Sequence, residues 1–204
     1  MKAGTATLDP ETLVETQLAL GQMHLDRGEP DQALEWFRAA ARSGDARALN
    51  MLGRAHERGW GMAVNAPQAA VYFREAAERG DVWAMFNLAD LYCRGVGVER
   101  DETTAYALYA EAARRGHAKS LNMLGLFHED GSAVPCDLDK AFSFFQAGAE
   151  AGDCWAQFNA ARLALSRGAT DEALRWLAAS LETGFTDYFV HLAAALEDDP
   201  DPRL

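Results

Sequence analysis

The sequence has few cysteines and no long apolar run. Its three cysteines, Cys93, Cys136 and Cys154, are an odd number and form no CxxC spacing. That pattern indicates neither a disulfide framework nor a zinc site. No segment approaches the roughly 18 apolar residues of a membrane span, and the first residues contain no stretch typical of a signal peptide. We therefore expect a cytoplasmic protein without structural metal.

Basic residues are also scarce. There are 19 Lys and Arg against 31 Asp and Glu, which gives a net charge of -12 over 204 residues. An acidic chain is repelled by phosphate backbones and anionic lipids, so neither nucleic acid nor a membrane is an expected partner. A phosphate-binding loop, a GxSxG elbow and an HExxH zinc motif are all missing. We predict no catalytic residues, no metal and no cofactor.

What the sequence does contain is a repeat of 36 residues. Three sets of landmarks keep this period: Gly44, Gly80, Gly116 and Gly152; Gly59, Gly95 and Gly131; and Asn65, Asp101 and Asp137. The first glycine set follows Ala-rich amphipathic stretches, where a residue with positive φ ends a helix. The Asn and Asp set precedes a second amphipathic stretch, where a short polar side chain caps a helix N-terminus.

Each repeat is therefore predicted to be a helical hairpin, and the fold class all-α. A stack of such hairpins buries a continuous core, which makes an α-solenoid. The predicted organisation is a flexible N-terminus at 1–10, one solenoid at 11–197 and an acidic tail at 198–204. Within the solenoid, the units are 14–45, 46–81, 82–117, 118–153 and 154–185, with a capping helix at 186–197. The first and last units lack four loop residues.

The unit at 82–117 is similar to the SEL-one-like repeat (SLR), a relative of the tetratricopeptide repeat with a longer loop. The residues that carry this resemblance are Asn87, Leu88, Tyr92, Gly95, Gly97, Val98, Asp101, Ala112, Ala113 and Gly116. The resemblance covers nearly the whole chain. It implies a right-handed superhelix, and a scaffold that holds a peptide or protein on the concave surface formed by the first helix of each hairpin.

A His-Glu pair recurs in LNMLGRAHERG at 49–59 and in LNMLGLFHEDG at 121–131. It invites a metal-site interpretation, but a zincin motif needs a second His four residues away, and neither stretch has one. His56 and His128 occupy the place that Tyr92 holds in the intervening unit. We therefore predict packing histidines.

By the same resemblance, the concave face is predicted from positions on the first helix of each unit. The candidate binding residues are Arg47, Asn50, Arg54, Trp83, Phe86, Asn87, Asp90, Lys119, Asn122, Trp155, Phe158, Asn159 and Arg162. WAMFN at 83–87 and WAQFN at 155–159 place a Trp and a Phe on one helix face. Exposed, they would be binding hot spots, but packing on the preceding helix is an equal alternative. Asn87 and Asn159 would bind a peptide backbone, or form an interhelical bond.

Basic residues outnumber acidic ones on this predicted face. The basic set is Arg47, Arg54, Arg58, Arg94, Lys119 and Arg162, and the acidic set is Glu57, Asp90, Glu129 and Asp130. The excess favours an acidic peptide segment, and the alternative is that the charges only solvate the face.

The predicted function is a non-enzymatic adaptor of bacterial type that binds a protein or peptide. A second interpretation is an immunity or inhibitor protein for a neighbouring effector. A remote third is a β-lactam-binding SLR protein, although that branch carries paired cysteines and a secretion signal that are not found here. Self-association through Tyr188, Phe189 and Leu192 of the last helix is a further alternative to their covering the final hairpin.

Overall fold

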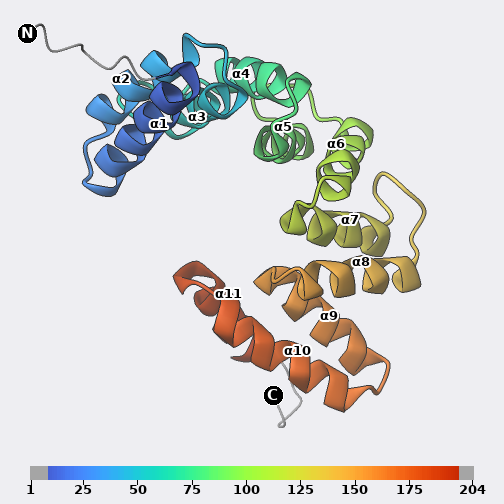
Figure 1. Ribbon diagram of the computed structural model, residues 1–204. Helices are drawn as coiled ribbons and strands as arrows, with labels where there is room; N and C mark the ends of the chain where they lie inside the picture. The colour runs from blue at the N-terminus through green and yellow to red at the C-terminus, as the bar shows by residue number, and fades with distance from the viewer. Residues whose placement is uncertain (1–8, 198–204) are drawn as a thin grey trace, which may run out of the picture. The chain divides into compact units, whose positions relative to one another are not determined.

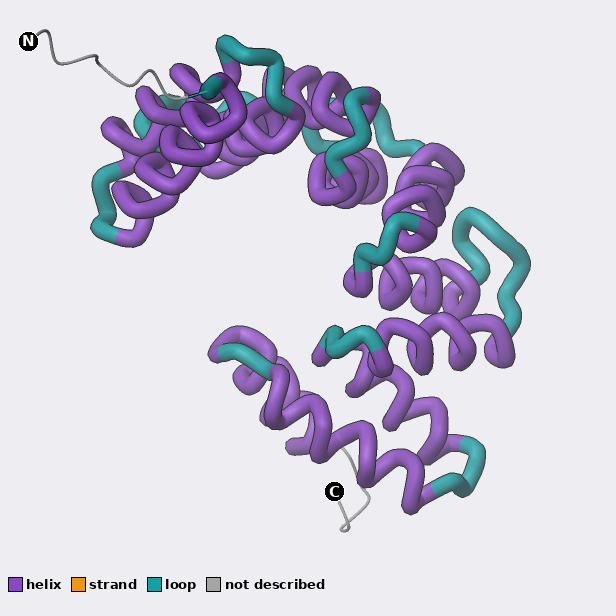
Figure 2. The backbone as a smooth tube through the Cα atoms, viewed as in Figure 1, coloured by secondary structure: helices purple, strands orange, loops and turns teal. Residues whose placement is uncertain are grey.

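The computed structural model describes residues 9–197, in which eleven helices and no strand occur (Figures 1 and 2). The all-α prediction is confirmed. The helices are α1 (Pro10–Asp26), α2 (Pro30–Ala41), α3 (Ala46–Arg58), α4 (Ala66–Glu78), α5 (Val82–Arg94), α6 (Glu102–Arg114), α7 (Ala118–Asp130), α8 (Leu138–Glu150), α9 (Cys154–Ser166), α10 (Thr170–Thr183) and α11 (Thr186–Glu197). We call α1, α3, α5, α7 and α9 the A helices, and the helices that follow each of them the B helices.

The chain forms two compact units, Met1–Leu108 and Tyr109–Leu204. In the first unit, α1 to α5 pack each against the next, and α3 also contacts α5. In the second unit, α7 to α10 pack in the same succession, and α7 contacts α9. Neighbour-to-neighbour packing of hairpins is the arrangement of an α-solenoid, as predicted from the period.

The predicted helix caps are present. The side-chain oxygens of Asn65, Asp101 and Asp137 accept hydrogen bonds of 3.0–3.1 Å from the backbone amides three residues further on. Each bond satisfies one of the amides that the first turn leaves without a partner. Gly80 has a φ of 92° and lies one residue beyond the cap of α4, in the left-handed region that favours glycine.

One backbone hydrogen bond closes the loop of every hairpin. Its donor is the residue just before the B helix, and its acceptor is a carbonyl near the end of the A helix. The donor and acceptor pairs, at 2.8–3.1 Å, are Glu29 and His24, Asn65 and His56, Asp101 and Tyr92, Asp137 and His128, and Ala169 and Ala164. The paired residues are nine apart in the three long repeats and five apart in the first and last. The same bond therefore closes loops of two lengths.

The core of each unit is built on aromatic rings that cover glycines. Phe73 of α4 is fully buried, and a Cβ added to Gly53 of α3 would lie 2.5 Å from its ring. Phe145 covers Gly125 in the same way, at 2.4 Å. Phe73 also packs in one cluster with Leu88 and Leu91 of the following A helix. Each ring thus joins its own hairpin to the next.

The ends of the chain differ slightly from the prediction. Residue Asp9 caps α1, and its side chain accepts a hydrogen bond from the Thr12 amide, so the last two residues of the predicted flexible segment 1–10 begin a helix. Residues 1–8 and the predicted acidic tail at 198–204 lie outside the described residues. In the second unit, Tyr188 and Leu192 of α11 are buried against Cys154 of α9.

Candidate binding surface on the A helices

The predicted asparagines pair with each other between successive A helices. In the first unit, Nδ2 of Asn87 on α5 donates a 2.9 Å hydrogen bond to Oδ1 of Asn50 on α3. In the second unit, Asn159 on α9 makes the same 2.9 Å bond to Asn122 on α7. Asn50, Asn122 and Asn159 are buried. Their amides therefore hold neighbouring repeats together, which is the interhelical alternative for this position.

A second link, between charged residues, lies further along the same helices. Nη2 of Arg94 donates to Oε1 of Glu57 at 2.8 Å and also lies 2.7 Å from Asp90. In the second unit, Arg162 binds both carboxylate oxygens of Glu129, at 2.8 and 2.6 Å. The excess of positive charge counted in the sequence is thus largely paired with carboxylates on this surface.

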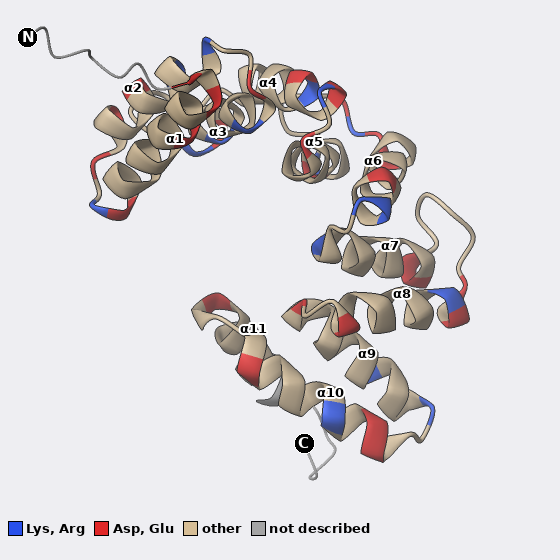
Figure 3. Cartoon of the chain, viewed as in Figure 1, with Lys and Arg blue, Asp and Glu red and all other residues tan. Residues whose placement is uncertain are grey.

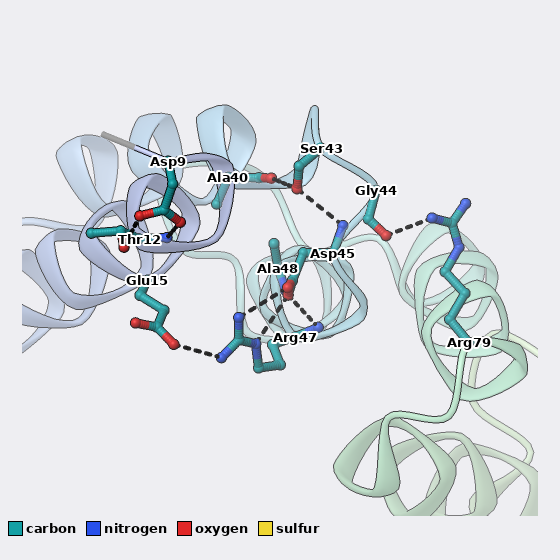
Figure 4. A network of polar contacts seen from close by, with 10 residues as sticks. All are labelled: Asp9, Thr12, Glu15, Ala40, Ser43, Gly44, Asp45, Arg47, Ala48 and Arg79. Atoms are coloured by element: carbon teal, nitrogen blue, oxygen red, sulfur yellow. Dashed lines mark hydrogen bonds and ion pairs between the residues drawn. The ribbon is translucent and has the colours of Figure 1, made fainter. Parts of the chain in front are cut away.

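Arg47, at the start of α3, belongs to a network in the first unit (Figure 4). Its guanidinium donates to Asp45 at 3.0 Å and lies 3.8 Å from a carboxylate oxygen of Glu15 on α1. Burial raises the pKa of Asp45, but hydrogen bonds from Arg47 and the Ala48 amide outweigh it and hold that pKa below its usual value. The guanidinium of Arg79 donates to the Gly44 carbonyl in the same region.

Arg54, about two turns further along the same face of α3, has a different environment. Its guanidinium lies 5.0 Å from the centre of the Trp60 ring, and no carboxylate of the described residues lies within ion-pair distance of it. Burial, and then the nearby charge of Arg58, lower its pKa from the ordinary value. Trp60 itself packs against the core around Phe37, 6.3 Å between ring centres. Arg54 is therefore a half-buried cation resting on an aromatic ring.

The two Trp-Phe pairs have different surroundings. Trp83 on α5 is 52% exposed, and Phe86 is half-buried. Trp155 on α9 packs edge-on against Tyr188 of α11, with ring centres 5.1 Å apart, and Phe158 joins the same cluster. Trp155 and Phe158 are therefore packed, but against α10 and α11 rather than against the preceding helix as the sequence suggested, whereas Trp83 is more than half exposed.

The remaining predicted residues, Lys119 and Asp90, are charged. Lys119, at the start of α7, is exposed and lowers the pKa of Asp153, which burial nonetheless raises above its usual value. Burial likewise raises the pKa of Asp90, although Arg94 acts in the opposite direction. Figure 3 shows acidic and basic residues distributed over both units rather than gathered on one helix.

The repeated histidines pack on aromatic rings. His56 stacks on Tyr72 with ring centres 5.3 Å apart, and His128 stacks on Phe144 at 5.4 Å. Among the described residues, no group of three or more His, Cys, Asp or Glu side chains is placed to hold a metal ion. Over the same residues, none of the helices combines the length and the apolarity that crossing a membrane requires.

Sequence reasoning missed the partners of these polar residues. Glu57 and Glu129 were counted only as charges of the face, yet each binds an arginine of the next A helix. The signal was available: Asn50 and Asn87 are 37 residues apart, as are Asn122 and Asn159. A separation of 37 residues, one more than the 36-residue repeat, places the two side chains on adjacent A helices at nearly the same level along the helix axes.

Comparisons with known proteins identify the repeat. The Sel1 repeat family model matches residues 14–45, 46–81, 84–117 and 118–153. No curated protein matches the sequence. The chain is similar to the crystal structure of a Sel1 repeat protein from Oxalobacter formigenes, with 27% identity over 95% of this chain and 80% of that one, and a TM-score of 0.79.

Two further structures share the fold. One is c5321, a protective antigen present in uropathogenic Escherichia coli strains that displays an SLR fold; it is 28% identical over 95% of this chain, with a TM-score of 0.71. The present chain covers 43% of that protein. The other is Pseudomonas aeruginosa pilF, 17% identical over 93% of this chain and 86% of that one, with a TM-score of 0.64, which shows the fold alone.

Proteins built from such repeats generally act as protein-interaction scaffolds and are typically not catalysts. The family match covers four consecutive hairpins, and the helices, caps and interhelical asparagines recur at its period. The chain belongs to the Sel1 repeat family.

Proposed function

We propose that the protein binds a peptide or protein segment on the A-helix surface of its first unit, centred on Trp83. We call this surface the Trp83 patch: Arg47, Asn50, Arg54, Trp83, Phe86, Asn87 and Asp90. The observation that carries the proposal is that Trp83, a large apolar side chain on the A helix α5, is 52% exposed. Tryptophan is the side chain most enriched at binding hot spots.

The polar residues of the patch support binding of an extended segment. Asn50 and Asn87 bond to each other, so an amide of a bound peptide would add to this pair rather than replace it. Arg54 lacks a carboxylate partner among the described residues, and its pKa is lowered by burial and by Arg58. A carboxylate of the ligand would relieve that unfavourable environment. We therefore favour an acidic segment, with Arg54 as its contact.

The second unit contributes differently to the proposal. Its predicted residues are Lys119, Asn122, Trp155, Phe158, Asn159 and Arg162. Trp155 and Phe158 pack against α11, and Arg162 is held by Glu129. A ligand would have to displace these contacts, so we assign this surface a secondary role, to which exposed Lys119 can contribute.

The test is selection of binders from a peptide display library, followed by calorimetric titration of the selected peptides. Trp83→Ala should weaken binding at least roughly tenfold, because hot-spot truncation costs about 2 kcal/mol or more. The matched control is Val71→Ala on α4, which removes a side chain that is 48% exposed on a B helix. Unchanged affinity of the Trp83 variant, with helical circular dichroism retained, would exclude the Trp83 patch.

A second measurement tests the chemistry of the ligand. If the segment is acidic, the selected peptides should be rich in Asp and Glu, and Arg54→Gln should weaken them selectively. Arg54→Gln keeps a polar side chain over Trp60 but removes the charge. Binding that needs Trp83 but not Arg54 would retain the proposed surface and reject the acidic preference.

A further inference from the structure

The last B helix, α10, exposes a row of apolar side chains. Leu174 is 47% exposed, Leu181 is 56% exposed, and Ala178 between them is also exposed. The spacings of four and three residues place all three on one face of the helix. We call Leu174, Ala178 and Leu181 the α10 row.

The preceding repeat shows what this face of a B helix normally contacts. The equivalent residues of α8, each 32 positions earlier, are Phe142, Gln146 and Ala149. Phe142 packs against a cluster that includes Trp176 of α10, and Nε2 of Gln146 donates to Glu172 of α10 at 2.9 Å. Ala149 is buried among residues of α9. On α8, this face therefore receives the next hairpin.

After α10, only one of the two helices that would make up a next hairpin is present in the described chain. Helix α11 takes the place of the next A helix, because Tyr188 and Leu192 lie 32 residues after the buried Ala156 and Ala160 and are buried themselves. No B helix follows α11 within residues 9–197. The α10 row thus keeps the apolar character of an internal contact, while the described chain supplies no helix to cover it.

The charges beside the row indicate which helix fits. Arg175 follows Leu174, and Glu182 follows Leu181, so both lie on the same flank. Both are exposed, and neither forms an ion pair within the described residues. They are seven residues apart, about 10 Å along a helix, too far to pair with each other. In an antiparallel pairing of two α10 helices, Leu174 of one copy faces Leu181 of the other, and Arg175 approaches Glu182.

We propose that α10 is a self-association surface, on which the α10 rows of two copies pair antiparallel about a two-fold axis near Ala178. Two identical ion pairs then flank the apolar seam, as a two-fold contact requires. Because α11 occupies the place of the next A helix, the first hairpin of another copy cannot continue the stack there. The pairing of two B helices leaves α11 in place.

The size of this surface sets the strength of the association. A pair of 14-residue helices buries less than the roughly 800 Å² per partner of a standard interface. We therefore expect a reversible dimer whose population rises with concentration, rather than a permanent one. Sedimentation velocity over a dilution series from micromolar to submillimolar concentration measures it directly.

The variants separate this contact from other modes of association. Leu174→Glu with Leu181→Glu should leave a monomer throughout the series, whereas Leu138→Glu, an exposed leucine of α8, should associate as the parent does. Arg175→Glu alone, or Glu182→Arg alone, should weaken the dimer roughly tenfold through facing like charges. The double exchange, R175E with E182R, should restore it.

Two outcomes would overturn the proposal. A parent protein that stays monomeric across the whole series has no such contact. A dimer that survives the double glutamate variant, or that the charge exchange does not restore, uses another surface or orientation. The substituted side chains are all exposed, so circular dichroism should show unchanged helix content in every variant. Peptide binding at the Trp83 patch is independent of these results.

Discussion

The side-chain amide of Asn159 donates its hydrogen bond to Asn122 across the interface between α9 and α7, at 2.9 Å, and both residues are buried. The corresponding hydrogen bond in the first unit, from Asn87 to Asn50, has the same donor–acceptor distance. Successive A helices are thus joined by a neutral side-chain bond that recurs in both units. A buried polar group without a hydrogen-bond partner is costly, and each asparagine supplies the partner of the asparagine on the neighbouring A helix. Each therefore stabilises the contact between the two repeats.

Each single asparagine variant should therefore lose more than half of the unfolding free energy that the double variant loses. Asn159→Ala leaves the Asn122 oxygen without its donor, and we expect a loss of about 1–3 kcal/mol in the free energy of unfolding. The double variant with Asn122→Ala should fall short of the sum by about 1 kcal/mol. Urea denaturation followed by circular dichroism gives all four values. Strict additivity would show that the bond contributes nothing, and Asn50 with Asn87 offers an independent second cycle.

The ion pair further along the helices should matter less. Glu129→Gln removes the negative charge and one of the two acceptor oxygens that bind Arg162, whose side chain is 44% exposed. Exposed pairs contribute about 0.2–1 kcal/mol and are screened by salt. The loss in unfolding free energy should therefore be smaller than for Asn159→Ala, and it should shrink further in 1 M salt. A larger and salt-independent loss would mean that Glu129 has a structural role beyond the pair.

Gly53→Ala should destabilise the protein, although alanine is the better helix former. The propensity gain is about 1 kcal/mol, but the new methyl group would lie 2.5 Å from the Phe73 ring, which is fully buried. Overpacking of this kind costs about 1–3 kcal/mol. The fifth repeat has Ala161 and Leu177 at these places, so Phe73→Leu should rescue Gly53→Ala. Thermal unfolding of both variants checks this, and a stabilised single variant would contradict it.

Stability should fall in mildly acidic solution because of His117. This residue stands where other repeats have an N-cap Asp, and burial, and then Lys119, lower its pKa to about 4. The folded protein then binds the proton less readily than the unfolded chain, whose pKa is 6.5. Stability is therefore lost as the pH falls from about 6.5 to about 4, by on the order of 3 kcal/mol at the lower limit.

The variant His117→Asn separates this contribution from that of the carboxylates. Asparagine is a good N-cap and does not titrate, so helix α7 keeps a suitable first residue. The difference in unfolding free energy between pH 7 and pH 4.5 should be smaller in this variant than in the parent. Equal pH dependence of the two proteins would show that His117 is solvated in the folded state.

The repeat period predicted most of the fold. Asn65, Asp101 and Asp137 cap helices as expected, because capping depends on residues three positions apart in the chain. The glycines ended helices for the same local reason. The period also placed His56 and His128 in a packing position, and their stacking on Tyr72 and Phe144 follows from residues inside the same hairpin.

The candidate site was less accessible to sequence reasoning. WAMFN and WAQFN are nearly the same, yet Trp83 is exposed and Trp155 packs on Tyr188, a residue of α11 outside the repeat. The number of basic residues on the surface also gave a wrong impression of its free positive charge, since Arg94 and Arg162 are paired with Glu57 and Glu129. Exposure and pairing both depend on contacts between repeats, and no local pattern contains them.

The backbone hydrogen bond that closes each hairpin allows the loop length to vary independently of the positions of the two helices. Since Glu29 binds the His24 carbonyl across five residues and Asn65 binds the His56 carbonyl across nine, both helices leave the loop at the same point regardless of what lies between. The segment between donor and acceptor can therefore differ in length between repeats without a change in the register of the helices, although single residues within it, such as Trp60, also pack against the core. Evolution, or a protein engineer, can use this tolerance to add residues to the short loops of the first and last repeats while both helices of the hairpin stay in place.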